Sequence, residues 1–294
     1  MHNFVRYNIS IADSLDEIGS GLMAPKKSFL DANRLRLSEL FADYNHKAEA
    51  NDLQSLKAEW AFEATDDKFD INEKNEMRQL AYGLYESDRI FVNKHWERLK
   101  AINGGKVLFC PICGLNVCKE MDHFVPRGLN DFPEYAAHLN NLIPLCHDCN
   151  HKKSNKFLDE EKRERLFFNA YYDTLTDREI LVGKVTLSPV DGLPKIEVSE
   201  NPRLKKNKVP DKYILSTIEK LGLMKEFNIK AEDLFRIEME LLCLKRTRYA
   251  WKTITEEMKE FAKRIEGDHD IVRPTVFAAI AESEDMEIWF NNLK

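Results

Sequence analysis

Two closely spaced pairs of cysteines constrain this chain more than any other feature of its sequence. Cys110 and Cys113 enclose two residues, as do Cys146 and Cys149, and residues 114–145 lie between the pairs. Each pair can form a turn that binds a metal ion through two thiolates, and two such turns supply the four sulfur ligands of a closed structural zinc site. We therefore expect two segments distant in sequence to meet at one zinc ion.

The other two cysteines, Cys118 and Cys243, have no partner at this spacing, and we interpret both as core thiols. Clustered cysteines are more often metal ligands than disulfides in a reducing compartment. The sequence has no run of about 18 apolar residues, and its start lacks a basic flank followed by an apolar segment. We expect no contact with a membrane, no signal peptide and a cytoplasmic location.

Composition favours a globular protein, since 43% of the 294 residues are hydrophobic and 32% are charged. The net charge of −6 argues against a general affinity for nucleic acid. Charge is uneven, however: residues 101–156 carry six Lys and Arg against five Asp and Glu, a net of +1. A local basic groove could still bind a phosphate backbone.

Helical periodicity marks both ends of the chain. Apolar residues recur at helical spacing in Phe29–Asn45 and in Glu76–Lys100, which Asn103–Gly105 should end. The pattern is helical again from Lys212 onward, and four apolar residues there recur at helical spacing: Leu234, Ile237, Leu241 and Leu244.

The centre of the chain is mixed. We expect a short strand before Cys110, a helix running from the second cysteine pair to about residue 175, a β-hairpin in Lys184–Ser199 and a basic loop in Asn201–Lys212. The fold class predicted is α+β. A small metal-binding module, residues 104–160, is inserted between a mainly helical N-terminal region, residues 1–103, and a mainly helical C-terminal region with a short hairpin, residues 161–294.

Harder ligands lie beside the cysteines. Asp122 and His123 follow the first pair, Asn141 precedes the second, and Asn150 follows it directly. A zinc ion joining the two pairs would bring a carboxylate, an imidazole and amide oxygens close together. This combination suits a second, harder ion better than it suits zinc.

The stretches "CPICG", "MDHFVPRG" and "NNLIPLCHDCNHKK" together resemble the HNH endonucleases with the ββα-metal fold, in the subgroup with zinc-binding cysteines. The resemblance covers residues 107–156. It implies a metal-dependent nuclease that hydrolyses phosphodiester bonds, most readily those of DNA.

The resemblance assigns a role to each motif residue. His123 would be the general base, Asp122 and Asn150 would bind a catalytic Mg²⁺ or Mn²⁺, and Asn141 would tie the motif loop together. Many family members have His where this chain has Asn150, and His151 follows it. Two adjacent residues on a helix point about 100° apart, so we favour Asn150 alone as the ligand.

Nearby cations are weaker candidates. Arg127 could clamp a phosphate or pair with an acidic neighbour, and Lys153 is the best of three lysines for a phosphate contact, ahead of Lys152 and Lys156. We expect His138, between the motifs, to be exposed to solvent.

Three functions remain open. The first is a metal-dependent endonuclease, and the second is a non-catalytic zinc module that binds nucleic acid or protein. The third is a nuclease subunit of a bacterial anti-phage defence or restriction complex, with an ATPase or sensor as partner. It is motivated by helical flanks that far exceed what a ββα module needs. The complete set of Asp122, His123, Asn141 and Asn150 favours a nuclease over the zinc module.

Overall fold

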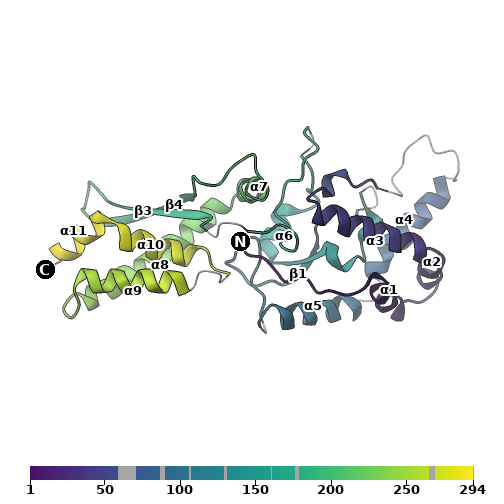
Figure 1. Ribbon diagram of the computed structural model, residues 1–294, viewed down its shortest axis with the longest axis horizontal. Coiled ribbons are helices and arrows are strands. Elements are labelled where there is room, and N and C mark those ends of the chain that lie inside the picture. The colour runs from purple at the N-terminus through teal and green to yellow at the C-terminus, as the bar shows by residue number, and fades with distance from the viewer. Residues whose placement is uncertain are drawn as a thin grey trace. The chain divides into compact units, whose positions relative to one another are not determined.

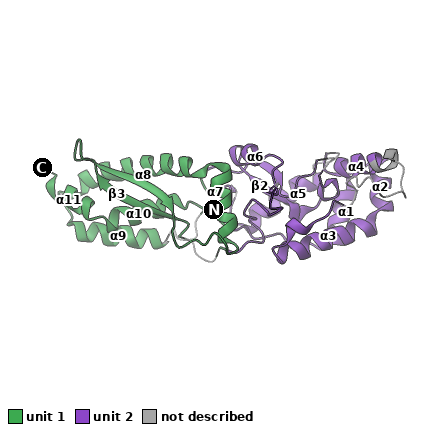
Figure 2. Ribbon diagram, turned by 90° about the horizontal axis from the view of Figure 1, so that it is seen from above, with its two compact units in different colours: residues 1–2, 112–115, 175–294 green, residues 3–111, 116–174 purple. Residues whose placement is uncertain are grey.

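The fold combines helices with two separate two-stranded antiparallel sheets, as an α+β protein should (Figure 1). The computed structural model describes residues 1–58, 71–86, 90–105, 107–128, 131–159, 161–175, 179–264 and 269–293. Its contacts form two compact units (Figure 2). The N-terminal unit comprises residues 3–111 and 116–174, and the C-terminal unit comprises residues 1–2, 112–115 and 175–294. The division expected at residues 103 and 160 stays a prediction.

The N-terminal unit consists of helices followed by a small sheet and one more helix. Its elements in chain order are α1 (Ile11–Ser20), α2 (Lys26–Ala32), α3 (Arg34–Glu49), η1 (Leu53–Ser55), α4 (Ile71–Glu86), α5 (Ile90–Ile102), β1 (Glu120–His123), η2 (Pro133–Tyr135), η3 (Leu139–Asn141), β2 (Leu142–Leu145) and α6 (His147–Lys153).

The helix expected over Phe29–Asn45 is broken at Asn33. There the backbone has φ −107° and ψ 11°, which ends α2 and begins α3. The Asn33 side-chain amide and its backbone N–H both donate to the carbonyl oxygen of Phe29, at 2.9 and 3.0 Å, and close the end of α2. The predicted apolar face is confirmed, since its four residues are buried: Leu37, Leu40, Phe41 and Tyr44.

The second predicted helical segment, Glu76–Lys100, covers most of α4 and α5, and residues 87–89 between these helices lie outside the described residues. The stop predicted at Asn103 is confirmed. Its backbone N–H and its side-chain amide both donate to the carbonyl of Leu99, at 3.0 and 2.9 Å.

A long helix was expected after the second cysteine pair, but the helix ends at Lys153, so the prediction is wrong for the residues that follow. Ser154 has φ 50° and ψ −139°, a conformation that no helix can continue. The following segment is irregular, and its only regular contact within the described residues is an isolated antiparallel bridge between Leu158 and Arg165. Arg165 is buried and pairs with Asp173 at 2.6 Å, an interaction that helical periodicity does not reveal.

The C-terminal unit places helices on a β-hairpin. Its elements are β3 (Leu181–Leu187), β4 (Pro194–Glu200), α7 (Asp211–Leu221), α8 (Leu223–Lys245), α9 (Trp251–Arg264), α10 (Val272–Glu282) and α11 (Glu284–Asn292). The hairpin predicted in Lys184–Ser199 is confirmed. None of the helices in the described ranges is long and apolar enough to cross a membrane.

One face of the hairpin forms the core of this unit. Along β4 the residues alternate between buried and exposed, so α8 covers only one side of the strand. The side-chain amide of Asn228, on α8, accepts from Val198 N–H at 2.8 Å and donates to the Val198 carbonyl at 2.9 Å. On β3, a Cβ at Gly183 would lie 2.7 Å from the Cβ of Ala279, so α10 packs directly against the strand backbone.

The helical pattern is confirmed in α8. The four residues that mark its spacing do not, however, form its buried face. Leu234 is buried, whereas Ile237, Leu241 and Leu244 have exposed fractions of 47%, 42% and 73%. The buried residues of this helix form a different stripe, against which β4, α7 and α10 pack: Leu223, Phe227, Ala231, Leu234, Phe235 and Leu242.

Candidate functional site

A short ββα arrangement carries the residues singled out in the sequence. β1 pairs with β2 in antiparallel register, with Asp122 opposite Ile143 and His123 opposite Leu142, and α6 follows β2. Because β1 contains Asp122 and His123 and α6 contains Asn150, the sheet and helix hold both ends of the motif together.

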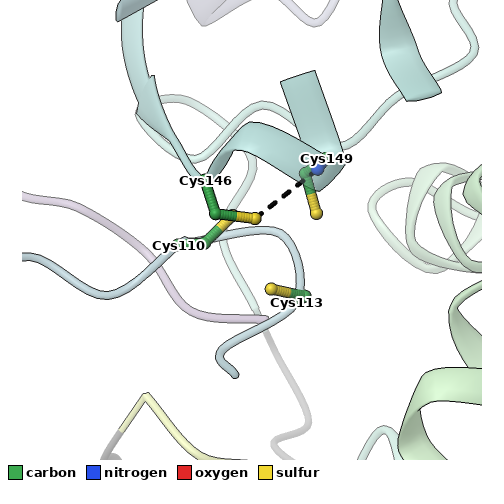
Figure 3. Close-up of side chains that lie close together, drawn as sticks. All are labelled: Cys110, Cys113, Cys146 and Cys149. Atoms are coloured by element: carbon green, nitrogen blue, oxygen red, sulfur yellow. Dashed lines mark hydrogen bonds between the residues drawn. The ribbon is translucent and has the colours of Figure 1, made fainter. Parts of the chain in front are cut away.

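The four paired cysteines form one buried cluster. Their sulfur atoms all lie within 4.8 Å of one another, and they point toward a common centre (Figure 3). A tetrahedral zinc site with Zn–S bonds of about 2.3 Å has sulfur–sulfur edges of about 3.8 Å. The spacing, the burial and the uniform sulfur donors fit a structural metal ion such as zinc. Among the described residues it is the only group of three or more His, Cys, Asp or Glu at such spacing.

Backbone geometry explains how each pair makes its turn. Gly114 follows the first pair with φ 71°, a conformation that residues with a side chain rarely adopt. In the second pair, Cys146 is the N-cap of α6, and its sulfur accepts from Cys149 N–H at 3.5 Å. Such a hydrogen bond favours the thiolate form that a metal ion needs.

A pocket of about 560 Å³ lies beside this arrangement. Five of the residues that line it are polar residues discussed below: Glu120, Asp122, His123, Arg127 and Asn150. All of these except Glu120 were predicted as site residues from the sequence, and the fold brings them together. Asn141 and Lys153 do not line the pocket.

Asp122 is nearly buried and already has a cationic partner. Its Oδ2 lies 2.7 Å from Lys153 Nζ, which also donates to the carbonyl of His123 at 2.9 Å. Burial raises the pKa of the Asp122 carboxyl, and the nearby Lys153 opposes that shift. Lys153 is 3% exposed and faces the protein interior, so its expected phosphate contact stays a prediction that would require this ion pair to open.

His123 is buried with a defined ring orientation. Its Nε2 lies 2.8 Å from the carbonyl oxygen of Ala136. Since a carbonyl only accepts, Nε2 carries the proton and Nδ1 is left with a free lone pair. The ring meets that of Tyr85 edge-on, with 4.5 Å between centroids. Burial lowers the pKa of His123 to about 3, so the ring is neutral at neutral pH.

Asn141 is fully buried, and its side chain ties two backbone segments and the Tyr44 hydroxyl together. Its Oδ1 accepts from Val125 N–H at 2.8 Å and from the Tyr44 hydroxyl at 3.0 Å. Its amide nitrogen donates to the carbonyls of Val125 and Tyr135, at 3.0 and 3.2 Å. These contacts suit the supporting role expected for this residue.

Glu120 belongs to the site although the sequence did not single it out. Its carboxylate accepts hydrogen bonds from the side-chain amide of Asn150 and, at 2.7 Å, from His147 Nδ1. Both hydrogen bonds lower the pKa of Glu120, and the one from Asn150 has the larger effect. The signal available in the sequence was its spacing, because residues two apart on a strand share one face, and Asp122 follows Glu120 at that distance.

Arg127 is held at the edge of the pocket by aromatic and acidic neighbours. Its guanidinium lies 4.2 Å from the Tyr82 ring centroid and 4.7 Å from that of Tyr85, and its Nη2 is 3.1 Å from Glu86. The acidic neighbour anticipated for Arg127 is therefore present. Its Nη1 is buried and makes no hydrogen bond within the described part of the chain.

His138, expected to be exposed, is buried. Its ring stacks on Phe41 with 4.2 Å between centroids, and its Nε2 lies 3.1 Å from Asn45 Oδ1. Burial lowers the pKa of His138 to about 3. The segment between the two motif halves thus packs on α3 and does not form a free loop.

Comparisons of the chain with protein-family models, with curated proteins and with solved structures give no match. Its candidate function therefore rests on the geometry described above.

Proposed function

We propose that the chain is a metal-dependent endonuclease of the HNH type that hydrolyses phosphodiester bonds of nucleic acid, in the first instance DNA. One observation carries the proposal: Asp122, His123 and Asn150 line a single pocket next to a four-cysteine cluster. The resemblance of residues 107–156 to HNH endonucleases agrees with it. A zinc module without catalysis needs the cysteines but has no use for this polar set.

The pocket offers ligands for a hard divalent ion. Asp122 supplies a carboxylate and Asn150 an amide oxygen, donors that Mg²⁺ and Mn²⁺ prefer. When bound, such an ion would stabilise negative charge on a phosphate and on its leaving oxygen. The Lys153 ammonium already balances part of the Asp122 charge, so it would keep that carboxylate ionised in its buried position.

His123 is the candidate general base. With Nε2–H fixed on the Ala136 carbonyl, Nδ1 is the nitrogen free to take a proton from a water molecule. Tyr85 packs edge-on against the ring and limits its rotation. Burial keeps the ring neutral at neutral pH, but the same lowered pKa makes it a weaker base than a free imidazole.

Arg127 is the candidate phosphate ligand. Two tyrosine rings and Glu86 hold its guanidinium beside the pocket, and its Nη1 has a donor to spare. A guanidinium can bind two phosphate oxygens at once, which would fix the orientation of the scissile group.

The test compares the wild-type protein with His123→Ala on supercoiled plasmid, with Mg²⁺ or Mn²⁺ and with no divalent ion. We expect metal-dependent nicking by the wild type. Removal of a general base typically slows the reaction by about 10² to 10⁴. Zinc content serves as a control and should not change. Thermal melting of the same preparations checks that the variant is folded at the assay temperature, because removal of a buried ring lowers stability. A folded His123→Ala protein that cuts at the wild-type rate would overturn the mechanism.

A non-catalytic zinc module is the second candidate. It is favoured by the ion pair between Lys153 and Asp122, which occupies the carboxylate intended for a metal ion. A non-catalytic module should bind one zinc per chain. It should not cleave nucleic acid, and it should not bind a second divalent ion at the pocket. Binding of Mn²⁺ that is lost in Asp122→Ala would exclude it.

A further inference from the structure

The loop that links β4 to α7 has a defined conformation. Asn201 is buried, and its side-chain amide donates to the carbonyl of Glu179 at 2.7 Å while its Oδ1 accepts from Arg203 N–H at 3.0 Å. Leu204 and Pro210 point inward, and Asp211 accepts from Lys205 N–H at 3.0 Å. The inward anchors fix which side chains must point outward.

The outward side chains of this loop are cationic. Arg203, Lys205, Lys206 and Lys208 are all exposed, and Lys212 follows in the first turn of α7. Arg203 lies 3.4 Å from Glu179, with both side chains mostly in solvent. Lys205, Lys206 and Lys208 form no ion pair with any other residue that the structure describes.

This loop is strongly basic within an acidic chain. The whole protein has a net charge of −6, yet residues 203–212 contain five Lys and Arg against one Asp, a net of +4. The one acid, Asp211, already binds a backbone N–H. Lys205, Lys206 and Lys208 lie close together in sequence and have no ion pair among the described residues, so they repel one another. An external polyanion would relieve that repulsion.

We propose that this basic loop, residues 203–212, binds the phosphate backbone of double-stranded DNA. The inference rests on the proposed function, which gives the protein a polyanionic substrate. A membrane surface fits less well, because insertion needs exposed apolar side chains and the loop offers only Val209. Contacts of this kind add affinity without reading sequence.

The experiment measures binding of full-length protein to a short labelled DNA duplex, in buffer without added divalent ion, at 50 and 200 mM salt. The loop variant carries Lys205→Gln, Lys206→Gln and Lys208→Gln. The matched control carries Lys252→Gln, Lys259→Gln and Lys263→Gln, three exposed lysines of α9, and makes the same change in net charge.

Each lost phosphate contact reduces the salt slope by about 0.9. The wild type should therefore lose affinity between the two salt concentrations by a factor on the order of 10 to 40 more than the loop variant does. The control should behave as the wild type.

Equal salt slopes for the wild type and the loop variant would overturn the inference. So would an equal loss in the control, which would indicate a general charge effect. Binding to phosphatidylserine vesicles through the same lysines, with none to DNA, would also contradict it. Since no cleavage is needed, loop-dependent binding without plasmid nicking would refute only the nuclease. Nicking with unaltered binding by the loop variant would refute only the loop's role.

Discussion

Glu120 holds the side-chain amide of Asn150, and this contact decides how that amide is presented to the pocket. With its nitrogen bound to a carboxylate, the amide keeps its oxygen free for a cation. Glu120→Ala should therefore weaken binding of Mn²⁺ by about 10 to 100-fold, as removal of such supporting hydrogen bonds does at other metal sites. Electron paramagnetic resonance of free and bound Mn²⁺ measures the affinity without any substrate.

The conservative variant Glu120→Gln separates two roles. Its amide oxygen can still accept from Asn150, so it should bind Mn²⁺ nearly as the wild type does if Glu120 only positions Asn150. Equal losses of Mn²⁺ affinity in Glu120→Gln and Glu120→Ala would instead indicate that Glu120 is itself a ligand. His147→Ala, which removes the other partner of Glu120, serves as control.

His138 should make folding sensitive to mild acid. Its pKa is about 3 in the folded protein, against about 6.5 in an unfolded chain. Below pH 6.5 this histidine is protonated in the unfolded chain but stays neutral in the folded protein. Its contribution to the free energy of unfolding is therefore complete above pH 6.5 and is lost as the pH falls toward 3. Between pH 6.5 and 5 the loss from this group is about 2 kcal/mol.

His138→Gln keeps a donor for Asn45 but does not titrate. Denaturant unfolding at both pH values should show the wild type losing about 2 kcal/mol more than this variant. His46→Gln, at an exposed position, should follow the wild type. If His138→Gln were as sensitive to acid as the wild type, the burial of this ring would not govern the effect.

At the scale of elements, we expect β1, β2 and α6 to depend on a metal ion held by the cysteine cluster. These elements are short, and structural zinc in small domains contributes about 10 to 16 kcal/mol of binding free energy. Cys146→Ser removes one metal ligand, while the serine hydroxyl can still cap α6. We expect loss of the metal together with loss of this local fold, read by metal analysis and circular dichroism.

Cys243, expected from the sequence to be a core thiol, is instead exposed and lies outside the cluster, so Cys243→Ser is the matched control. It should keep the metal content and the melting temperature of the wild type. A Cys146→Ser protein with full metal content and unchanged melting would refute the role of the cluster.

Elements with strong local signals were predictable from the sequence. The hairpin has alternating residues around a Pro-Val-Asp-Gly turn, and α5 ends at an Asn-Gly-Gly stop. Long-range contacts were not predictable. The break at Asn33, the left-handed φ of Ser154 and the choice of core face on α8 all depend on what packs nearby.

At the scale of the whole molecule, some features of the candidate site were predictable from the sequence and others were not. The cysteine cluster and the meeting of Asp122, His123 and Asn150 could be read from spacing, because two metal-binding turns fix the segments that carry them. The inward turn of Lys153 and the contact of Glu120 with Asn150 depend on side-chain directions. Spacing alone does not determine those directions.

The contact of Asn228 with β4 has a consequence for self-association. A two-stranded sheet leaves unpaired backbone groups along its outer edges, which can recruit a strand from another copy and start aggregation. Asn228 satisfies both backbone groups of Val198 by imitating a neighbouring strand. One helix side chain thus occupies a position at which a foreign strand would begin to pair, and it protects the hairpin from growing into an intermolecular sheet.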